Sequence, residues 1–203
     1  MNLNFSNNTL TGQNSHGINV FWGTPSTGTL QAKMDGNIIG NAAVAGSGSA
    51  IGNGIRVNGN GNGTMIVLLN NNTIRQTPNG RGIEVIGRNG TGRADVTITN
   101  NNINPQDVSG FPLSAIIVQS NTVTVTGYTV RADIRGNIVP TGTAFDLGTG
   151  FISLVETSTS NNQLVNTTGS GTPTAQLSAT NTGSVYSNAG VSLIAGPIST
   201  PPF

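Results

Sequence analysis

Two acidic residues, Glu84 and Asp146, are the side chains of this sequence best suited to chemistry. Each stands third in a recurring four-residue segment: a small residue, an apolar residue, a variable residue and another apolar residue. Two carboxylates about 5–10 Å apart can together hydrolyse a glycosidic bond. However, a copy of the segment with Ile117 at the variable position separates the two acids, and another copy places Arg56 next to Glu84. We therefore expect no catalytic residues and no enzyme activity.

Metal and cofactor chemistry finds few suitable ligands in this sequence. It has no cysteine and a single histidine, His16, which argues against thiolate sites and histidine-rich zinc sites. The seven acidic residues form no short cluster, whereas Ca²⁺ takes about 6–8 oxygen ligands. We expect His16 to be a turn residue, and we predict no metal site and no cofactor.

The composition argues against two further kinds of partner. Only 7% of the residues are charged and the net charge is +1, so no basic cluster attracts nucleic acid. No apolar run approaches the roughly 20 residues of a membrane span, so we expect no membrane insertion. The absence of cysteine fits a bacterial exported protein at least as well as a cytosolic one, and we expect the chain to be extracellular or on the cell surface of a bacterium.

The elements that position these residues begin with a segment built around an asparagine. Apolar residues precede it at alternate positions, which is typical of a strand with one buried face. The clear corner asparagines are Asn8, Asn37, Asn72, Asn101 and Asn137, with a degenerate sixth at Asn162. Because asparagine tolerates the left-handed backbone conformation that a sharp bend needs, we predict that the chain turns a corner at each one.

The four-residue segment follows each asparagine in constant order. Its copies begin at Gly17, Gly54, Gly82, Ala115, Ala144 and Thr174. Constant order with uneven spacing indicates stacked parallel coils whose insertions lie between the asparagine and this segment. A β-sandwich, the main rival, needs antiparallel strands and evenly spaced hairpins. We predict an all-β, right-handed parallel β-helix (solenoid) of about six coils, with coils over residues 1–165 and a degenerate last coil and C-terminal tail over 166–203.

Residues 72–74 (Asn-Thr-Ile) and 82–85 (Gly-Ile-Glu-Val) resemble motifs of the pectate-lyase-like right-handed parallel β-helix superfamily. More narrowly, the chain is similar to repeat regions of large bacterial secreted β-strand-repeat proteins. The resemblance covers about residues 1–165. It implies that the five corner asparagines stack as an internal hydrogen-bonded ladder, and that a ligand groove follows the sheet formed by the four-residue segments. It does not define a function, because enzymes, adhesins and tail spikes share this fold.

Stacking places equivalent residues of successive coils side by side. It predicts two adjacent pairs of opposite charge, Arg56 with Glu84 and Asp95 with Arg131. The candidate ligand face consists of Asn19, Trp22, Arg56, Glu84 and Asp146. Trp22, together with Phe21, either stacks against sugar rings or caps the first coil.

The function that we expect is that of a non-catalytic structural or adhesive β-helix module. The partners that we expect are carbohydrate or neighbouring copies. Because Met1 falls on an inward position and the first coil has no cap, we expect the chain either to be a fragment of a longer one or to stack end to end with neighbours. The alternative is a polysaccharide lyase or glycoside hydrolase of the pectate-lyase-like superfamily.

Overall fold

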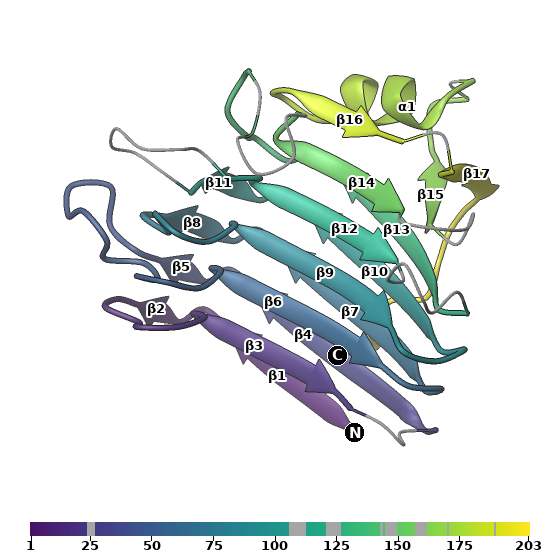
Figure 1. Cartoon of the computed structure of the whole chain (residues 1–203), viewed down its shortest axis with the longest axis horizontal. Coiled ribbons are helices and arrows are strands. Elements are labelled where there is room, and N and C mark those ends of the chain that lie inside the picture. The colour runs from purple at the N-terminus through teal and green to yellow at the C-terminus, as the bar shows by residue number, and fades with distance from the viewer. Residues whose placement is uncertain are drawn as a thin grey trace.

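The computed structural model describes residues 1–23, 27–105, 113–120, 127–142, 144, 150–156, 162–169, 171–188 and 190–203. These residues wind into a parallel β-solenoid of about five turns (Figure 1), slightly fewer than the six coils predicted. Each complete coil contributes one strand to each of three parallel sheets. The fold class predicted from the repeat is therefore confirmed.

Two long sheets face each other, and a short sheet lies at the corner between them. The seven-stranded sheet contains β1 (Asn2–Ser6), β4 (Thr29–Asp35), β7 (Thr64–Asn70), β10 (Arg93–Thr99), β13 (Thr129–Arg135), β15 (Asn162–Asn166) and β17 (Ser192–Ala195). The four-stranded sheet contains β2 (Thr9–Leu10), β5 (Ile38–Ile39), β8 (Thr73–Arg75) and β11 (Asn102–Asn104). The six-stranded sheet contains β3 (Ile18–Trp22), β6 (Ile55–Asn60), β9 (Ile83–Arg88), β12 (Ile116–Ser120), β14 (Ile152–Glu156) and β16 (Val185–Ser187).

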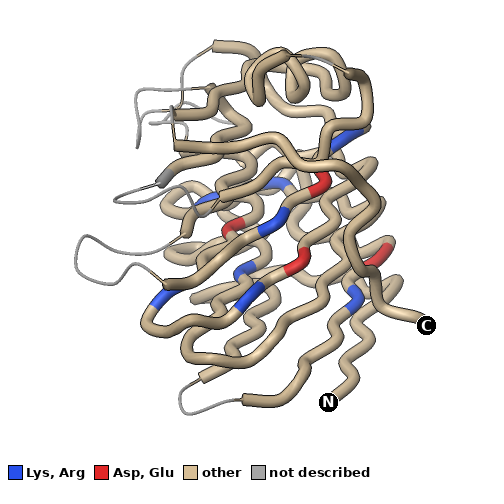
Figure 2. The backbone as a smooth tube through the Cα atoms, turned by 90° about the vertical axis from the view of Figure 1, so that its right-hand side faces the viewer, with Lys and Arg blue, Asp and Glu red and all other residues tan. Residues whose placement is uncertain are grey.

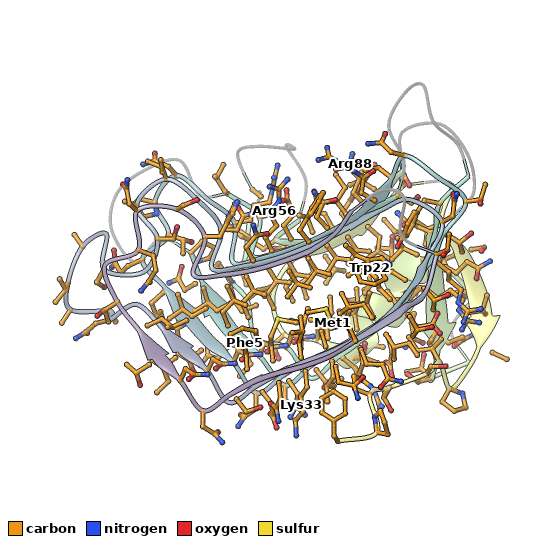
Figure 3. The ribbon with its side chains drawn as sticks, turned by 90° about the horizontal axis from the view of Figure 1, so that it is seen from below. Met1, Phe5, Trp22, Lys33, Arg56 and Arg88 are labelled. Atoms are coloured by element: carbon orange, nitrogen blue, oxygen red, sulfur yellow. The ribbon has the colours of Figure 1, made fainter. Side chains whose placement is uncertain are left out.

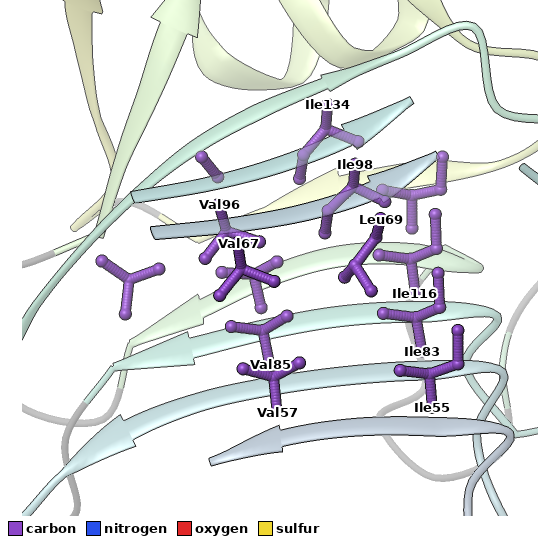
Figure 4. Close-up of a cluster of buried hydrophobic side chains, with 14 of the residues drawn as sticks. Ile55, Val57, Val67, Leu69, Ile83, Val85, Val96, Ile98, Ile116 and Ile134 are labelled. Atoms are coloured by element: carbon purple, nitrogen blue, oxygen red, sulfur yellow. The ribbon is translucent and has the colours of Figure 1, made fainter. Parts of the chain in front are cut away.

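The core lies between the two long sheets and consists of stacked aliphatic side chains. Figure 4 shows Ile55, Ile83 and Ile116 in one column, above one another in successive coils. All three side chains are fully buried, as are Val67, Val96 and Ile98 on the opposite sheet. Burying one such side chain contributes about 1.5–3 kcal/mol, so these columns supply most of the driving force for stacking.

The bend before each corner asparagine differs from the prediction in one detail. The residues with left-handed backbone are those immediately before the ladder, namely Asn7, Gly36, Asn71, Asn100 and Gly136. Asparagine and glycine are the two residue types that adopt this conformation most readily. The prediction that the corner asparagines themselves are left-handed was therefore wrong, because the preceding residue makes the turn and leaves the corner side chain directed inward.

The glycine that opens the four-residue segment is required by close packing between coils. A Cβ at Gly54 would meet the side chain of Ile74 at 2.5 Å and the carbonyl oxygen of Gly82 at 2.8 Å. A Cβ at Gly82 would likewise overlap the side chain of Ile103 and the carbonyl oxygen of Ala115. The small residue therefore lets the short strand at the corner pack against the start of the next long strand.

The last coil departs from the predicted repeat. Residues 174–177, which were predicted to be a strand, lie in the helix α1 (Pro173–Thr180), because Thr172 caps its N-terminus and proline occupies its first turn. The strand expected at 144–147 is instead β14, which pairs with β12. Of residues 144–147 only Ala144 is among the described residues. Asn162 is not a corner but lies in β15, opposite Val130.

The C-terminal segment turns back after β17 and runs along the outer side of the seven-stranded sheet towards the first coil (Figure 2). Ile198 and Pro201 of this segment are buried. Three residues of β10 that face outward, Asp95, Thr97 and Thr99, are also buried. The tail therefore belongs to the folded unit and does not extend from it.

Candidate functional site

The five predicted corner asparagines form one hydrogen-bonded column inside the solenoid. The side-chain oxygen of Asn101 accepts from the backbone N–H of Asn72 at 2.9 Å and from its side-chain amide at 2.9 Å. The same two bonds link Asn8 to Asn37, Asn37 to Asn72, and Asn101 to Asn137. Each amide from Asn37 onward also donates to a strand carbonyl of the preceding coil, as Asn101 does to Leu69 at 2.9 Å.

The ladder continues to a residue that sequence reasoning missed. Asn137 donates its backbone N–H, at 3.0 Å, and its side-chain amide, at 2.9 Å, to the side-chain oxygen of Asn181. Asn181 follows α1 directly, so no alternating strand precedes it and the repeat pattern could not reveal it. Asn37, Asn72, Asn101 and Asn137 are fully buried, and each unpaired polar group there would cost about 1–3 kcal/mol.

The candidate ligand face is the outer side of the six-stranded sheet, where equivalent residues align as predicted. The row runs Asn19, Arg56, Glu84, Ile117, Ser153 and Tyr186. Ser153 occupies the place predicted for Asp146, which lies outside the described residues. Ser153 takes this place because β14 begins later in the chain than the repeat indicated.

Glu84 is held by three partners on this face. Its Oε2 lies 2.8 Å from Nε of Arg56 and accepts from the side-chain amide of Asn53 at 3.0 Å. Its Oε1 accepts from Nη1 of Arg81 at 2.7 Å. The predicted pairing of Arg56 with Glu84 is therefore confirmed, and Figure 3 shows Arg56 directed away from the core. The glutamate side chain is only 12% exposed, so these partners take the place of most of its contacts with water.

His16 belongs to the same cluster and is more than a turn residue. Its Nδ1 accepts from the backbone N–H of Asn53 at 2.9 Å, and its Nε2 lies 3.5 Å from Nη1 of Arg56. Burial lowers the pKa of His16 below its usual 6.5, the positive charge of Arg56 lowers that pKa further, and Glu84 opposes both effects. His16 is therefore favoured in its neutral form.

The two aromatic residues at the end of β3 point in opposite directions. Trp22 packs against the core cluster and lies between the two long sheets in Figure 3. Phe21 faces outward and is 57% exposed. Of the two roles considered for Trp22, capping the first coil fits its position, and Phe21 is the exposed aromatic side chain that β3 presents on the ligand face. Placing Trp22 on that face was wrong because side chains alternate along the strand.

The second predicted charge pair lies on the opposite sheet. Arg131 donates from Nε to Oδ1 of Asp95 at 2.7 Å and from Nη2 to Oδ2 at 2.5 Å. Arg93 adds a contact of 3.3 Å to Oδ1. The hydrogen bonds to Asp95 raise the pKa of Arg131, and Asp95 is fully buried. Basic and acidic positions thus lie next to one another along the coils (Figure 2), which is typical of structural pairs.

Neither a metal site nor a membrane span is found in the part of the chain that the structure describes. No group of three or more histidine, aspartate or glutamate side chains lies together there. Within the same residues, no helix combines the length and apolar character needed to cross a membrane.

Comparison with known proteins leaves the fold as the firm result. No protein-family model, curated protein or solved structure matches this chain. The structure of this chain alone shows the parallel β-solenoid and its asparagine ladder. Its function is inferred below from the residues on its surface.

Proposed function

We propose that this chain is a non-catalytic structural or adhesive β-helix module of a bacterial secreted or cell-surface protein, with carbohydrate as the ligand of its six-stranded face. The observation that carries the proposal is the environment of Glu84, whose two oxygens contact Arg56, Arg81 and Asn53. The resemblance to the pectate-lyase-like superfamily, and to repeat regions of secreted proteins, supports the same class.

The partners of Glu84 are unsuited to acid, base or nucleophilic catalysis. A general acid or base must lie within hydrogen-bond reach of the reacting oxygen, whereas the carboxylate of Glu84 is directed at two guanidinium groups and an amide. A nucleophile needs an oxygen that can reach the sugar, and both oxygens of Glu84 already have cationic or amide partners within 3.0 Å. Glu84 is therefore better placed to hold Arg56 and Arg81 than to react.

The remaining groups on this face suit reversible binding of a neutral polar ligand. Asn19 is exposed and offers an amide that both donates and accepts, and Phe21 presents an aromatic ring two residues further along β3. Aromatic faces pack against the apolar faces of sugar rings, while amides bind the hydroxyl groups. The location proposed, outside the cell or on its surface, is based on the resemblance to repeat regions of bacterial secreted proteins.

The test combines a turnover assay with a glycan array. We expect no cleavage of pectin, alginate or related glycans, and binding of at least one glycan that Phe21→Ala weakens by about fivefold, since stacking contributes about 1 kcal/mol. Phe203→Ala is the matched control, because Phe203 is also exposed but ends the segment that runs along the other long sheet.

Two results would overturn the proposal in different ways. Turnover that disappears in Glu84→Gln or Asp146→Asn would establish the alternative, a polysaccharide lyase or glycoside hydrolase. Binding that is unaffected by Phe21→Ala, or equally weakened by Phe203→Ala, would show that the six-stranded face is not the ligand face.

A further inference from the structure

The two ends of the solenoid terminate the asparagine ladder differently. At the C-terminal end, α1 supplies the last acceptor: the backbone N–H of Asn181 donates to the carbonyl of Leu177 at 3.1 Å. The side-chain amide of Asn181 donates to the same carbonyl at 3.0 Å and to that of Ile134 at 3.1 Å. The carbonyl oxygen of Leu177 thus accepts from Asn181 the two hydrogen bonds that the next asparagine accepts in every earlier coil.

At the N-terminal end the ladder stops at an acceptor. The side-chain oxygens of Asn37, Asn72, Asn101, Asn137 and Asn181 each accept two N–H groups from the corner before them. Asn8 donates to Asn37, but its own side-chain oxygen accepts no hydrogen bond from the residues that the structure describes. The ladder therefore has a direction, and its N-terminal end lacks a donor.

The N-terminal face also exposes strand edges and apolar side chains. The strands β1, β2 and β3 are the end strands of the three sheets, each paired on one side only. Phe5, opposite the buried Met34, occupies an inward position of β1 but is 44% exposed, and Met1, directly before β1, is 68% exposed. Leu3 and Trp22 are partly buried beside them, and Figure 3 looks directly onto this face. Free edges of this kind pair with further strands.

A second intact copy does not complement this face from its C-terminal end. The donors that the ladder requires there, the two N–H groups of Asn181, are already bonded to Leu177 and Ile134. The helix α1 also packs against β16 and β13, so it covers part of the end that a head-to-tail contact would need (Figure 1). The partner must therefore be a coil with free asparagine donors and parallel strands.

We propose that the N-terminal face, formed by β1, β2, β3 and Asn8, is a docking surface for a parallel β-coil with an asparagine corner, supplied by another β-helical segment. This inference rests on the proposed role as a structural module and identifies the kind of partner that binds the N-terminal end of the solenoid. The incoming asparagine donates its backbone N–H and side-chain amide to the oxygen of Asn8, as Asn8 does to Asn37. The incoming strand pairs with β1 and covers Met1 and Phe5.

The test supplies such a coil at high effective concentration. A copy of residues 64–93 is fused in front of Met1 of the full chain, where the register of β7 with β4, and of β4 with β1, places the added corner next to Asn8. The amides of Asn2, Asn4 and Ser6 point away from β4, because Met1 and Asn7 form the bonds to it. We expect the hydrogen exchange of these three amides to slow by roughly tenfold or more.

The matched control is the same fusion with Asn72→Leu in the added copy alone, which keeps the strands but removes the corner donors. In this control we expect the hydrogen exchange of the β1 amides to slow less than in the first fusion. Unchanged exchange of the amides of Val96 and Ile98 in β10 shows that the original coils remain folded. Unchanged exchange of Asn2, Asn4 and Ser6 in the first fusion, or equal protection by both fusions, would overturn the proposal.

Sedimentation of the unmodified chain tests whether a second copy of the same chain binds to the N-terminal face. We expect a monomer at rising concentration, and concentration-dependent filaments would overturn the exclusion of a second copy. These outcomes are independent of the turnover assay, so failure of the docking proposal and failure of the non-catalytic proposal are distinguishable.

Discussion

Replacing Asn101 with leucine separates the contribution of the ladder from that of the apolar core. Leucine has a similar volume and keeps the interior filled, but it can neither accept nor donate a hydrogen bond. The substitution removes two bonds that Asn101 accepts from Asn72 and two that its amide donates, to Leu69 and to Asn137. The backbone N–H of Asn72 then has no acceptor in a fully buried position.

The expected loss is large compared with total stability. An unpaired buried donor costs about 1–3 kcal/mol, and each further hydrogen bond contributes about 0.5–1.5 kcal/mol, partly offset by the added apolar burial. We expect Asn101→Leu to lower the free energy of unfolding by about 2–5 kcal/mol. Asn8→Leu removes only donated bonds at the exposed end, so we expect a loss below about 1 kcal/mol.

Equilibrium unfolding in urea, followed by circular dichroism, measures both values from the transition midpoints when the slopes agree. The reasoning predicts that Asn101→Leu is much less stable than Asn8→Leu. Equal losses, or an Asn101→Leu variant as stable as the unchanged protein, would show that the interior hydrogen bonds contribute little and that apolar stacking alone holds the coils together.

Three further predictions concern the core, the corner and the charged cluster. Ile98→Asp places an unpaired charge in a fully buried position, so we expect a loss of more than about 4 kcal/mol in urea unfolding; an unchanged melting temperature would contradict the register of β10. Gly82→Val overlaps Ile103 and the carbonyl of Ala115, so we expect a lower melting temperature, whereas Gly28→Val, which has open space, serves as control. Because the folded state lowers the pKa of His16, the contribution of neutral His16 to the free energy of unfolding is fully present above pH 6.5 and declines as the pH falls through the lowered pKa. We expect His16→Gln to remove this part of the pH dependence of stability, and identical pH profiles of the two proteins would refute the prediction.

The sequence predicts the middle of the solenoid well because stacking makes one coil a template for the next. Once the asparagines were aligned, the pairing of Arg56 with Glu84 and of Asp95 with Arg131 followed from position alone, and the structure has both pairs. The partners Asn53 and Arg81 occupy the position before the repeated glycine, as His16 does. Extending the same rows by one residue would have found them.

The last coil was harder to predict because its determinants are local. Thr172 and Pro173 start a helix where the repeat called for a strand, and capping signals of this kind act over single residues while the repeat acts over whole coils. The four-residue pattern is also short, so residues 144–147 matched it although β14 lies at 152–156. The direction of the ladder has no counterpart in the sequence, because each asparagine is both donor and acceptor.

The most direct test of the account is a measurement of proton contacts between successive corners in solution. Nuclear Overhauser spectra are predicted to show contacts between the side-chain amide protons of Asn72 and those of Asn101, together with contacts between Ile83 and Ile116 in the column of buried isoleucines. The absence of these contacts, or close Hα–Hα contacts between neighbouring strands of the kind found in antiparallel sheets, would contradict a parallel solenoid held by an asparagine ladder.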